Sequence, residues 1–241
     1  MDTLLKVDHV SKRFGALIVV DQLSFSVAPG EALGIIGPNG AGKSTIFNLI
    51  TGDLSADAGN IILNGAEVSR LSPHTRCHAG IGRTYQIPHP FAKMTVFENL
   101  LVGATFSSRH READIYDHSV RVLQATGLLA MANAQAGSLT LLQRKRLELA
   151  RALATGPQLL LLDEIAGGLT EPECQELLET IRRVNASGVA IVWIEHIVHA
   201  LVSFASRIMV VNAGRKLDDD IPARVLANPA VKEVYLGLPA S

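Results

Sequence analysis

Three short segments of the chain consist of apolar residues and glycine without a polar interruption. They are Ala32–Ile36, Leu159–Leu162 and Val189–Ile194. Strands that are apolar on both faces are typical of a parallel sheet covered by helices on both sides. Each segment is followed at once by glycine or charged residues, and ligands bind at the carboxyl ends of the strands in such sheets. The pattern therefore predicts an α/β fold with its chemistry at one edge of the sheet.

Two stretches of the chain have the spacing of amphipathic helices. In Glu173–Asn185 the apolar residues recur on one face, and Thr170 with Glu173 forms a T-x-x-E capping box before it. Gln143–Thr155 is predicted to be a second helix, which ends before a Gly-Pro pair. Its basic residues are expected to point outward to solvent: Arg144, Lys145 and Arg151.

The N-terminal stretch has a different pattern, with short apolar runs divided by turn residues. Leu4–Val10, Val20–Val27 and Asn60–Leu63 are predicted strands, which indicates an antiparallel β part. In residues 87–140, between the first and second apolar segments, helix signals are more frequent than strand signals, as at Val96–Gly103 and Ile115–Thr126. We expect a helical sub-domain there.

The most specific motif is GPNGAGKST at Gly37–Thr45, directly after the first apolar strand. It fits the phosphate-binding pattern G-x-x-x-x-G-K-[ST], and a predicted helix follows it. Glycines let the backbone approach a phosphate chain closely, and N–H groups at a helix N-terminus attract its oxygens. Lys43 is expected to reach the β- and γ-phosphates and Ser44 to ligate Mg²⁺. The simpler alternative is a glycine-rich turn. The predicted nucleotide contacts in this loop are Gly37, Pro38, Asn39, Gly40, Ala41, Gly42, Lys43, Ser44 and Thr45.

Bulk composition narrows the class of protein further. The chain has 241 residues, a net charge of −1 and no long basic run, so direct nucleic-acid binding is not expected. Its 2 cysteines fit a reducing compartment better than a disulfide scaffold. The N-terminus has no signal-peptide pattern, and no apolar run approaches the roughly 20 residues needed to cross a bilayer. We expect a cytoplasmic protein that reaches a membrane only through a partner.

Polar residues after the other two apolar strands are candidates for the same site. Asp163 is placed to hold Mg²⁺, and Glu164 next to it to polarise an attacking water. An acidic pair that only caps the next helix is the alternative. His196 follows the third strand and is a candidate γ-phosphate contact, although a lone histidine is more often a surface residue. Gln86 carries little signal by itself, and Phe14 either stacks on adenine or belongs to the core.

Together these motifs resemble the nucleotide-binding subunit of an ABC transporter over nearly the whole chain. Gly37–Thr45 matches Walker A, and Leu159–Asp163 followed by Glu164 matches Walker B with its catalytic-type glutamate. The resemblance assigns the Q-loop glutamine to Gln86, the switch histidine to His196 and the adenine-stacking aromatic to Phe14. The catalytic residues it implies are Lys43, Gln86, Glu164 and His196, and the implied Mg²⁺ ligands are Ser44, Gln86 and Asp163.

The resemblance also implies a fold and a division of the chain. The fold is a P-loop NTPase of ABC type, with a mostly parallel RecA-like core sheet, an antiparallel β sub-domain and a helical sub-domain. Residues 1–241 form a single ABC ATPase domain. Residues 1–86 and 156–241 are its catalytic core with the β part, and residues from about 87 to 155 form the inserted helical sub-domain.

Finer features are similar to the ATPases of branched-chain (hydrophobic) amino acid importers. Met94–Leu100, Arg146–Ala152 and Val231–Gly237 are in the style of that subfamily. Related ATPases serve urea, amide and lipid systems, which stay open as alternatives. Family members bind ATP and Mg²⁺ and close head to tail in pairs on transmembrane permeases, which work with a substrate-binding protein. The implied location is the inner face of the cell membrane, through the permease.

The signature region departs from the family pattern LSGGQ. The aligned residues are Leu139, Thr140, Leu141, Leu142 and Gln143, so two leucines replace the two glycines. Leucine adds apolar bulk where a partner's γ-phosphate approaches backbone N–H groups, and burying such groups unpaired costs about 1–3 kcal/mol each. In addition, Ile165 replaces the usual proline after Glu164, and Thr170 stands where the D-loop commonly has Asp or Asn.

The residues that serve the chain's own nucleotide are present, whereas the signature and D-loop offered to a partner are altered; Ile165, next to Glu164, is the exception to this division. We therefore expect an asymmetric heterodimer, in which this Walker A and a partner's intact signature hydrolyse ATP. The competing hypothesis is that the altered loop impairs hydrolysis and leaves a nucleotide binder. Other classes stay open: a soluble ABC ATPase without a permease, a P-loop kinase or GTPase, and a non-catalytic interaction subunit.

Overall fold

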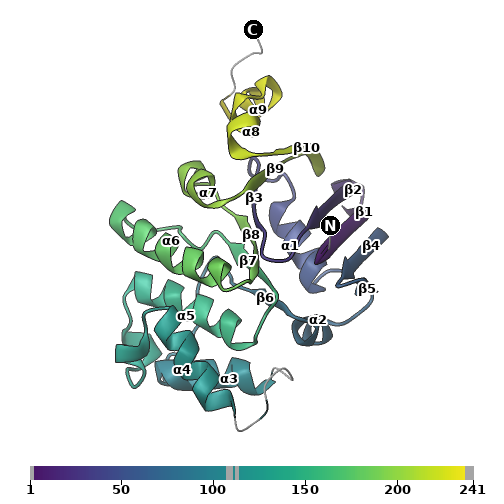
Figure 1. Ribbon diagram of the computed structural model, residues 1–241. Helices are drawn as coiled ribbons and strands as arrows, with labels where there is room; N and C mark the ends of the chain where they lie inside the picture. The colour runs from purple at the N-terminus through teal and green to yellow at the C-terminus, as the bar shows by residue number, and fades with distance from the viewer. Residues whose placement is uncertain (1–2, 107–110, 112–113, 237–241) are drawn as a thin grey trace. The chain divides into compact units, whose positions relative to one another are not determined.

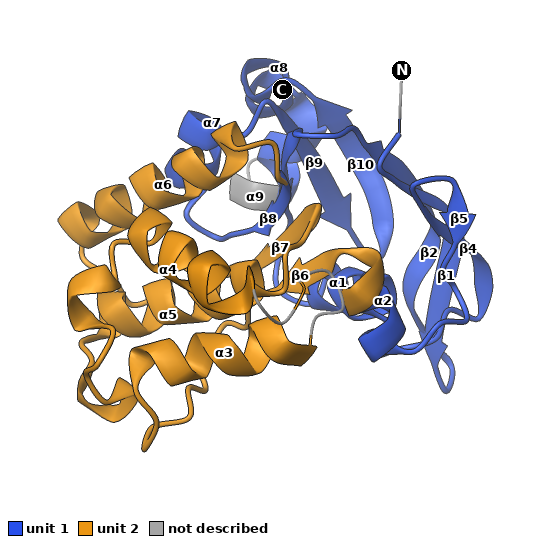
Figure 2. Cartoon of the chain, turned by 60° about the horizontal axis from the view of Figure 1, so that its bottom comes forward, with its two compact units in different colours: residues 1–76, 190–241 blue, residues 77–189 orange. Residues whose placement is uncertain are grey.

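The computed structural model describes residues 3–106, 111 and 114–236 (Figure 1). Gly237, the last residue of the predicted C-terminal motif, lies outside them. The chain forms two compact units, residues 1–76 with 190–241 and residues 77–189 (Figure 2). The sequence-based division near residues 86 and 156 stays a prediction.

The first unit contains an antiparallel sheet of four strands in the order β2-β1-β4-β5. The strands are β1 (Leu5–Phe14), β2 (Leu17–Val27), β4 (Ala58–Leu63) and β5 (Ala66–Glu67). Leu5 and Val7 are buried while Lys6 between them is exposed, which is the alternation of a strand with one face on a core. The predicted antiparallel β part is thus confirmed, with strands longer than the sequence pattern indicates.

The same unit has a second set of strands in the order β10-β9-β3-β8. β3 (Ala32–Ile36) pairs in parallel with β8 (Ala190–Ile194) and β9 (Arg207–Asn212), and β10 (Arg215–Asp220) is antiparallel to β9. Every residue of β3 and β8 is buried, as their apolar sequences predict. β9 was missed from the sequence, although four of its six residues are buried and apolar.

Helices of the first unit flank these strands. They are α1 (Lys43–Thr51), α7 (Val198–Phe204), α8 (Pro222–Ala227) and α9 (Pro229–Leu236), and α2 (Pro73–Ala79) begins in this unit. Arg76 of α2 is buried, and its guanidinium donates to the carbonyls of Leu49 and Ile50 at 2.6 and 2.9 Å. Because the last carbonyls of a helix have no partner within it, Arg76 satisfies the end of the helix that follows the phosphate loop.

The second unit combines two parallel strands with a group of helices. β6 (Ile81–Arg83) pairs with β7 (Leu159–Asp163). The helices are α3 (Val96–Phe106), α4 (Ile115–Ala125), α5 (Leu141–Ala154) and α6 (Glu171–Ala186), with short 3₁₀ turns at Leu129–Met131 and Ala136–Ser138. α3, α4 and α5 contact one another, and α6 contacts α4 and α5. The four helices predicted for this part of the chain are all present.

One expectation about α5 is wrong. Arg144 is exposed as predicted, but Lys145 is only 3% exposed. Its ammonium group donates to the main-chain carbonyl of Gln86 at 2.6 Å. A helix pattern assigns charged residues to the solvent face, and it cannot show that a distant loop brings an acceptor to the buried face.

Candidate nucleotide-binding site

The phosphate loop connects β3 to α1 in the first unit. At Gly37 an added Cβ would lie 2.1 Å from the carbonyl oxygen of Val211, and at Gly42, where φ is 99°, it would lie 2.5 Å from that of Val19. Gly40 has a φ of 79° and open space on its Cβ side. Gly37 and Gly42 are therefore required because a side chain would collide with the chain's own backbone, whereas Gly40 has open space beside it.

Lys43 is the first residue of α1 and is only 6% exposed. Its ammonium group donates to the carbonyls of Gly37 at 2.7 Å and Pro38 at 3.0 Å, so it lies over the loop itself. The N-cap of α1 is Gly42, which has no side chain to accept from the first N–H groups of the helix. A helix N-terminus without a side-chain cap, next to an ammonium group, is an environment that favours an anion.

His196 follows the carboxyl end of β8, which is the parallel neighbour of β3. The first unit therefore brings His196 and the phosphate loop to the same edge of its sheet, as the sequence pattern predicts. The His196 side chain is exposed. Its backbone N–H and that of Ile197 donate to the buried carboxylate of Glu195, at 3.0 and 3.4 Å, so Glu195 holds the turn that presents the histidine.

Asp163 ends β7 in the second unit, and the structure gives it a partner that sequence reasoning missed. Arg83, at the end of β6, lies 2.8 Å from the Asp163 carboxylate, and both side chains are largely buried. The hydroxyl of Thr84 also accepts from the backbone N–H of Asp163 at 3.3 Å. Because β6 and β7 are parallel neighbours, Arg83 and Asp163 leave the sheet at the same edge. This pairing of strands carries no signal in the sequence.

Glu164 and Gln86 meet at the same edge. The side-chain amide of Gln86 donates to the Glu164 carboxylate at 2.5 Å. Glu164 has a φ of 45°, which is uncommon for a residue other than glycine. Ile165, which stands in place of the usual proline, is completely buried. The second unit thus brings together three predicted site residues, Gln86, Asp163 and Glu164.

The altered signature forms the N-terminus of α5. Thr140 is the N-cap, and its N–H and hydroxyl exchange hydrogen bonds with the side chain and N–H of Gln143 in a capping box. The two leucines differ: Leu142 is 8% exposed and belongs to the core, whereas Leu141 is 43% exposed. The D-loop is Gly167–Thr170, and a Cβ on its Gly168 would lie 3.3 Å from a methyl group of Leu141. Leu141 therefore lies beside the D-loop at the start of α5.

The D-loop leads into α6 as the sequence predicts. Thr170 is the N-cap of α6, and its N–H and hydroxyl donate to the Glu173 carboxylate at 2.8 and 2.7 Å. The two Thr170 donors hold the pKa of Glu173 below its ordinary value. The T-x-x-E capping box is confirmed.

Phe14 lies at the end of β1 in the first unit, with 47% of its surface exposed. The ammonium group of Lys12 lies 5.6 Å from the centre of its ring. Of the two alternatives that the sequence left open, exposure excludes a core position and leaves the ring available for stacking.

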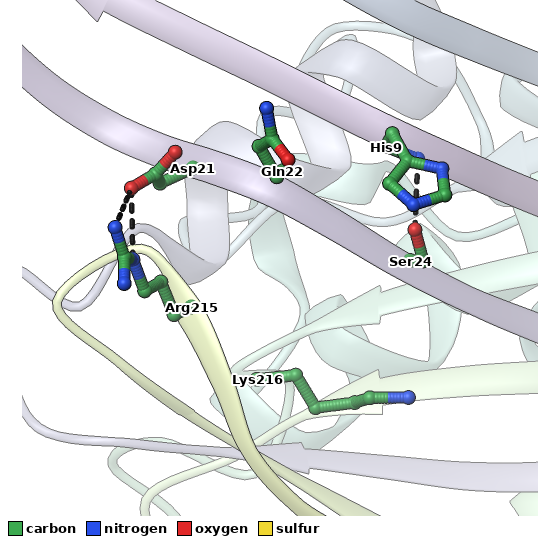
Figure 3. A pocket seen from close by; sticks show the side chains of 6 residues that line it. All are labelled: His9, Asp21, Gln22, Ser24, Arg215 and Lys216. Atoms are coloured by element: carbon green, nitrogen blue, oxygen red, sulfur yellow. Dashed lines mark hydrogen bonds and ion pairs between the residues drawn. The ribbon is translucent and has the colours of Figure 1, made fainter.

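A separate pocket of about 570 Å³ lies in the first unit and contains no predicted site residue (Figure 3). His9, Asp21, Gln22, Ser24, Arg215 and Lys216 line it. Arg215 points to Asp21 and pairs with it at 2.6 Å, and Lys216 pairs with Asp219 at 3.1 Å. Its cationic groups are thus matched by carboxylates, which does not favour an anionic ligand.

The fold and the phosphate loop between β3 and α1 define a P-loop nucleotide-binding protein of the α/β class. The sequence profile described as ABC transporter matches residues 20–167. The high-affinity branched-chain amino acid transport ATP-binding protein LivG of Escherichia coli K12 is 36% identical, over 97% of this chain and 98% of LivG. The corresponding protein BraF of Pseudomonas aeruginosa is 34% identical over the same shares. The chain therefore belongs to the ABC transporter family of ATP-binding proteins, whose members hydrolyse ATP.

Solved structures agree with this assignment. The ADP conformation of an ATP-binding cassette of an ABC transporter has a TM-score of 0.90 at 30% identity, covering 99% of this chain and 100% of that one. A nucleotide-free ATP-binding cassette has a TM-score of 0.88 at 29% identity, covering 98% and 100%. The predicted fold class is confirmed. Among the described helices, none has the length and apolarity to span a bilayer.

Proposed function

We propose that this chain is the ATP-hydrolysing motor subunit of an ABC importer for branched-chain or other hydrophobic amino acids. The observation that carries the proposal is the phosphate loop, with Lys43 held over it at the uncapped N-terminus of α1. The substrate class is supported by the names of the relatives LivG and BraF, which match 97% of this chain. The transported compound contacts the permease and not this subunit, so its identity is inferred only from the similarity to these relatives.

Each proposed role belongs to a named residue. Lys43 and the loop amides bind the β- and γ-phosphates, and Phe14 stacks on adenine. Glu164, oriented by Gln86 at 2.5 Å, polarises the attacking water, and His196 contacts the γ-phosphate. Cytoplasmic placement, on the inner face of the membrane through the permease, follows from the same proposal.

Mg²⁺ is proposed as the metal of this site. Its proposed ligands, Ser44, Gln86 and Asp163, offer hydroxyl, amide and carboxylate oxygens, the hard donors that Mg²⁺ prefers. The Asp163 carboxylate is buried and oriented by Arg83, which suits a group that must present oxygen in a fixed direction. Bound Mg²⁺ would neutralise charge on the phosphate oxygens. Arg83 is not proposed as a ligand, and its part is to orient the Asp163 carboxylate.

A second ATPase subunit is proposed as the partner in a head-to-tail heterodimer. Leu141 and buried Leu142 replace two glycines at the N-terminus of α5, so this half of the partner's site is apolar. We propose that the site formed by this chain's Walker A and the partner's signature hydrolyses ATP. The site formed by the partner's Walker A and this chain's signature hydrolyses ATP slowly or not at all. The alternative, a nucleotide binder with weak hydrolysis at both sites, rests on the same two leucines.

The test of the nucleotide site is titration calorimetry with Mg·ATP on the purified chain. We expect binding in the wild type and none in Lys43→Ala, because the ammonium group is removed from the loop. Lys6→Ala is the control, since Lys6 lies on an exposed part of β1 and loses an equal charge. Absence of binding in the wild type, or equal binding in Lys43→Ala, would overturn the proposal.

A further inference from the structure

The Q-loop segment, residues 84–91, leaves β6 after Arg83 and has no regular secondary structure. Only its first residue continues the pairing of the strands, through a bond from the Thr84 N–H to the carbonyl of Leu161 at 2.9 Å. Backbone donors and acceptors beyond that point need other partners. Helix α5 supplies three of them.

The contacts follow one stripe of α5, at positions 145, 148 and 151. Lys145 donates to the carbonyl of Gln86 at 2.6 Å, and the N–H of Tyr85 donates to the Glu148 carboxylate. Arg151 donates to the carbonyl of His89 at 2.9 Å. The Arg151 guanidinium also lies 5.1 Å from the ring of Phe91 and pairs with Glu148 at 3.1 Å. Four residues of the segment, Tyr85, Gln86, His89 and Phe91, are therefore held by three residues of the helix.

Two of these contacts use buried charges. Lys145 is 3% exposed and Glu148 is 6% exposed. Burial raises the pKa of Glu148, against the opposing effect of Arg151. Burying a charge costs free energy unless it is paired and hydrogen-bonded, so groups in this position are tied to specific acceptors and donors. Here those acceptors and donors are main-chain groups of the Q-loop segment.

The side chain of Gln86 is exposed, although its amide meets Glu164 at 2.5 Å. An exposed side chain is not fixed by packing, so this contact depends on where the backbone of Gln86 is held. Lys145 and Glu148 hold the backbone on the two sides of the peptide bond between Tyr85 and Gln86.

We propose that Lys145 and Glu148 are positioning residues, which fix the Gln86 backbone so that its side chain rests on Glu164. Helix α5 begins at the signature, which is the surface offered to a partner, and further along it holds the backbone of Gln86. One rigid helix therefore connects that surface, through Gln86, with the chain's own Glu164. This second step rests on the proposed function. The positioning itself does not, since it concerns contacts within the chain.

The first test is hydrogen exchange, measured by mass spectrometry on the purified full chain without nucleotide. Lys145→Met and Glu148→Met remove the polar group and keep the side chain long and unbranched. We expect exchange in peptides covering 84–91 to become about tenfold faster, with peptides covering 141–154 unchanged. Glu148→Gln keeps an acceptor oxygen and is expected to restore protection. Arg146→Gln is the matched control, because Arg146 lies on the same helix and pairs with Glu176 at 3.0 Å.

The second test is ATP hydrolysis by the chain assembled with its partner subunits. Misplacement of Gln86 is expected to lower kcat about 10- to 100-fold in Lys145→Met, with KM for ATP changed less than about twofold. Unchanged exchange at 84–91, an equal rise over 141–154, or unaltered kcat would each overturn the positioning role. If the proposed function is wrong, a different result is expected: the wild type does not bind Mg·ATP, but exchange at 84–91 still becomes faster in Lys145→Met and Glu148→Met.

Discussion

The guanidinium of Arg83 lies 2.8 Å from the carboxylate of Asp163, and both groups are largely withdrawn from water. Removing one partner of a buried ion pair leaves an uncompensated charge, which costs about 3–5 kcal/mol. We therefore expect Arg83→Met to lower the free energy of unfolding by about that amount in urea titration. In the double variant Arg83→Met/Asp163→Asn the charge is gone as well, and most of the loss should be recovered. No recovery would show that Arg83 acts through packing alone.

The glycines of the phosphate loop give a second prediction. Gly37→Ala places a Cβ 2.1 Å from the Val211 carbonyl, so the loop or β9 must move. Strain of this kind costs about 1–3 kcal/mol and sometimes more, and we expect both the free energy of unfolding and Mg·ATP affinity to fall. Gly40→Ala meets open space, and its cost is limited to the left-handed backbone, about 1–2 kcal/mol. Urea unfolding of the two variants compares them directly; equal losses would contradict the steric argument.

These glycines also show which features of the loop could be predicted from the sequence and which could not. The motif predicts the loop, the strand before it and the helix after it, because all of that information is local. The sequence interpretation attributes the glycines to the approach of a phosphate. The structure adds that Gly37 is required by β9, a strand that was missed and that pairs with β3 across about 170 residues. Such contacts between distant segments leave no periodic signal in one sequence.

The altered signature gives a third prediction, because its two leucines differ in burial. Leu142→Ala removes a core side chain and is expected to cost about 2–5 kcal/mol, which would confuse any activity measurement. Leu141 is exposed, so Leu141→Gly perturbs the core far less and is the cleaner test. In the asymmetric heterodimer we expect little change in the ATPase rate of the assembled transporter. A large gain would support impairment by the altered loop instead.

Site residues that belong to a motif could be predicted from the sequence. Residues that act through a hydrogen bond or ion pair with a distant segment could not. Asp163 and Glu164 were expected from their place after an apolar strand and Gln86 from the family resemblance, and the structure brings all three to one edge of β6 and β7. Arg83 and Lys145 were not identified as parts of the site. Both are basic residues whose usual place is the surface, and their burial depends on acceptors supplied by distant segments.

The Thr170 and Glu173 capping box gives a prediction about pH. Two donors of Thr170 favour the charged form of Glu173 and hold its pKa below the ordinary value. A depressed pKa in the folded state means that the stabilisation is present above the ordinary pKa and is lost as pH falls through the depressed one. Thr170→Val removes the hydroxyl donor and keeps the backbone N–H. We expect the pKa of Glu173, measured by NMR titration of its carboxyl carbon, to rise part of the way to its ordinary value.

Glu98 is the internal control for this titration. Thr95 donates to it through the same two groups, at 2.7 and 2.9 Å, and these donors likewise lower the pKa of Glu98. Because this capping box starts a different helix, α3, Thr170→Val should leave the pKa of Glu98 where it is. If both carboxyls shift together, the variant has changed the fold and not the cap. If neither shifts, the hydroxyl of Thr170 contributes nothing to the charge of Glu173, and the N–H alone accounts for its depressed pKa.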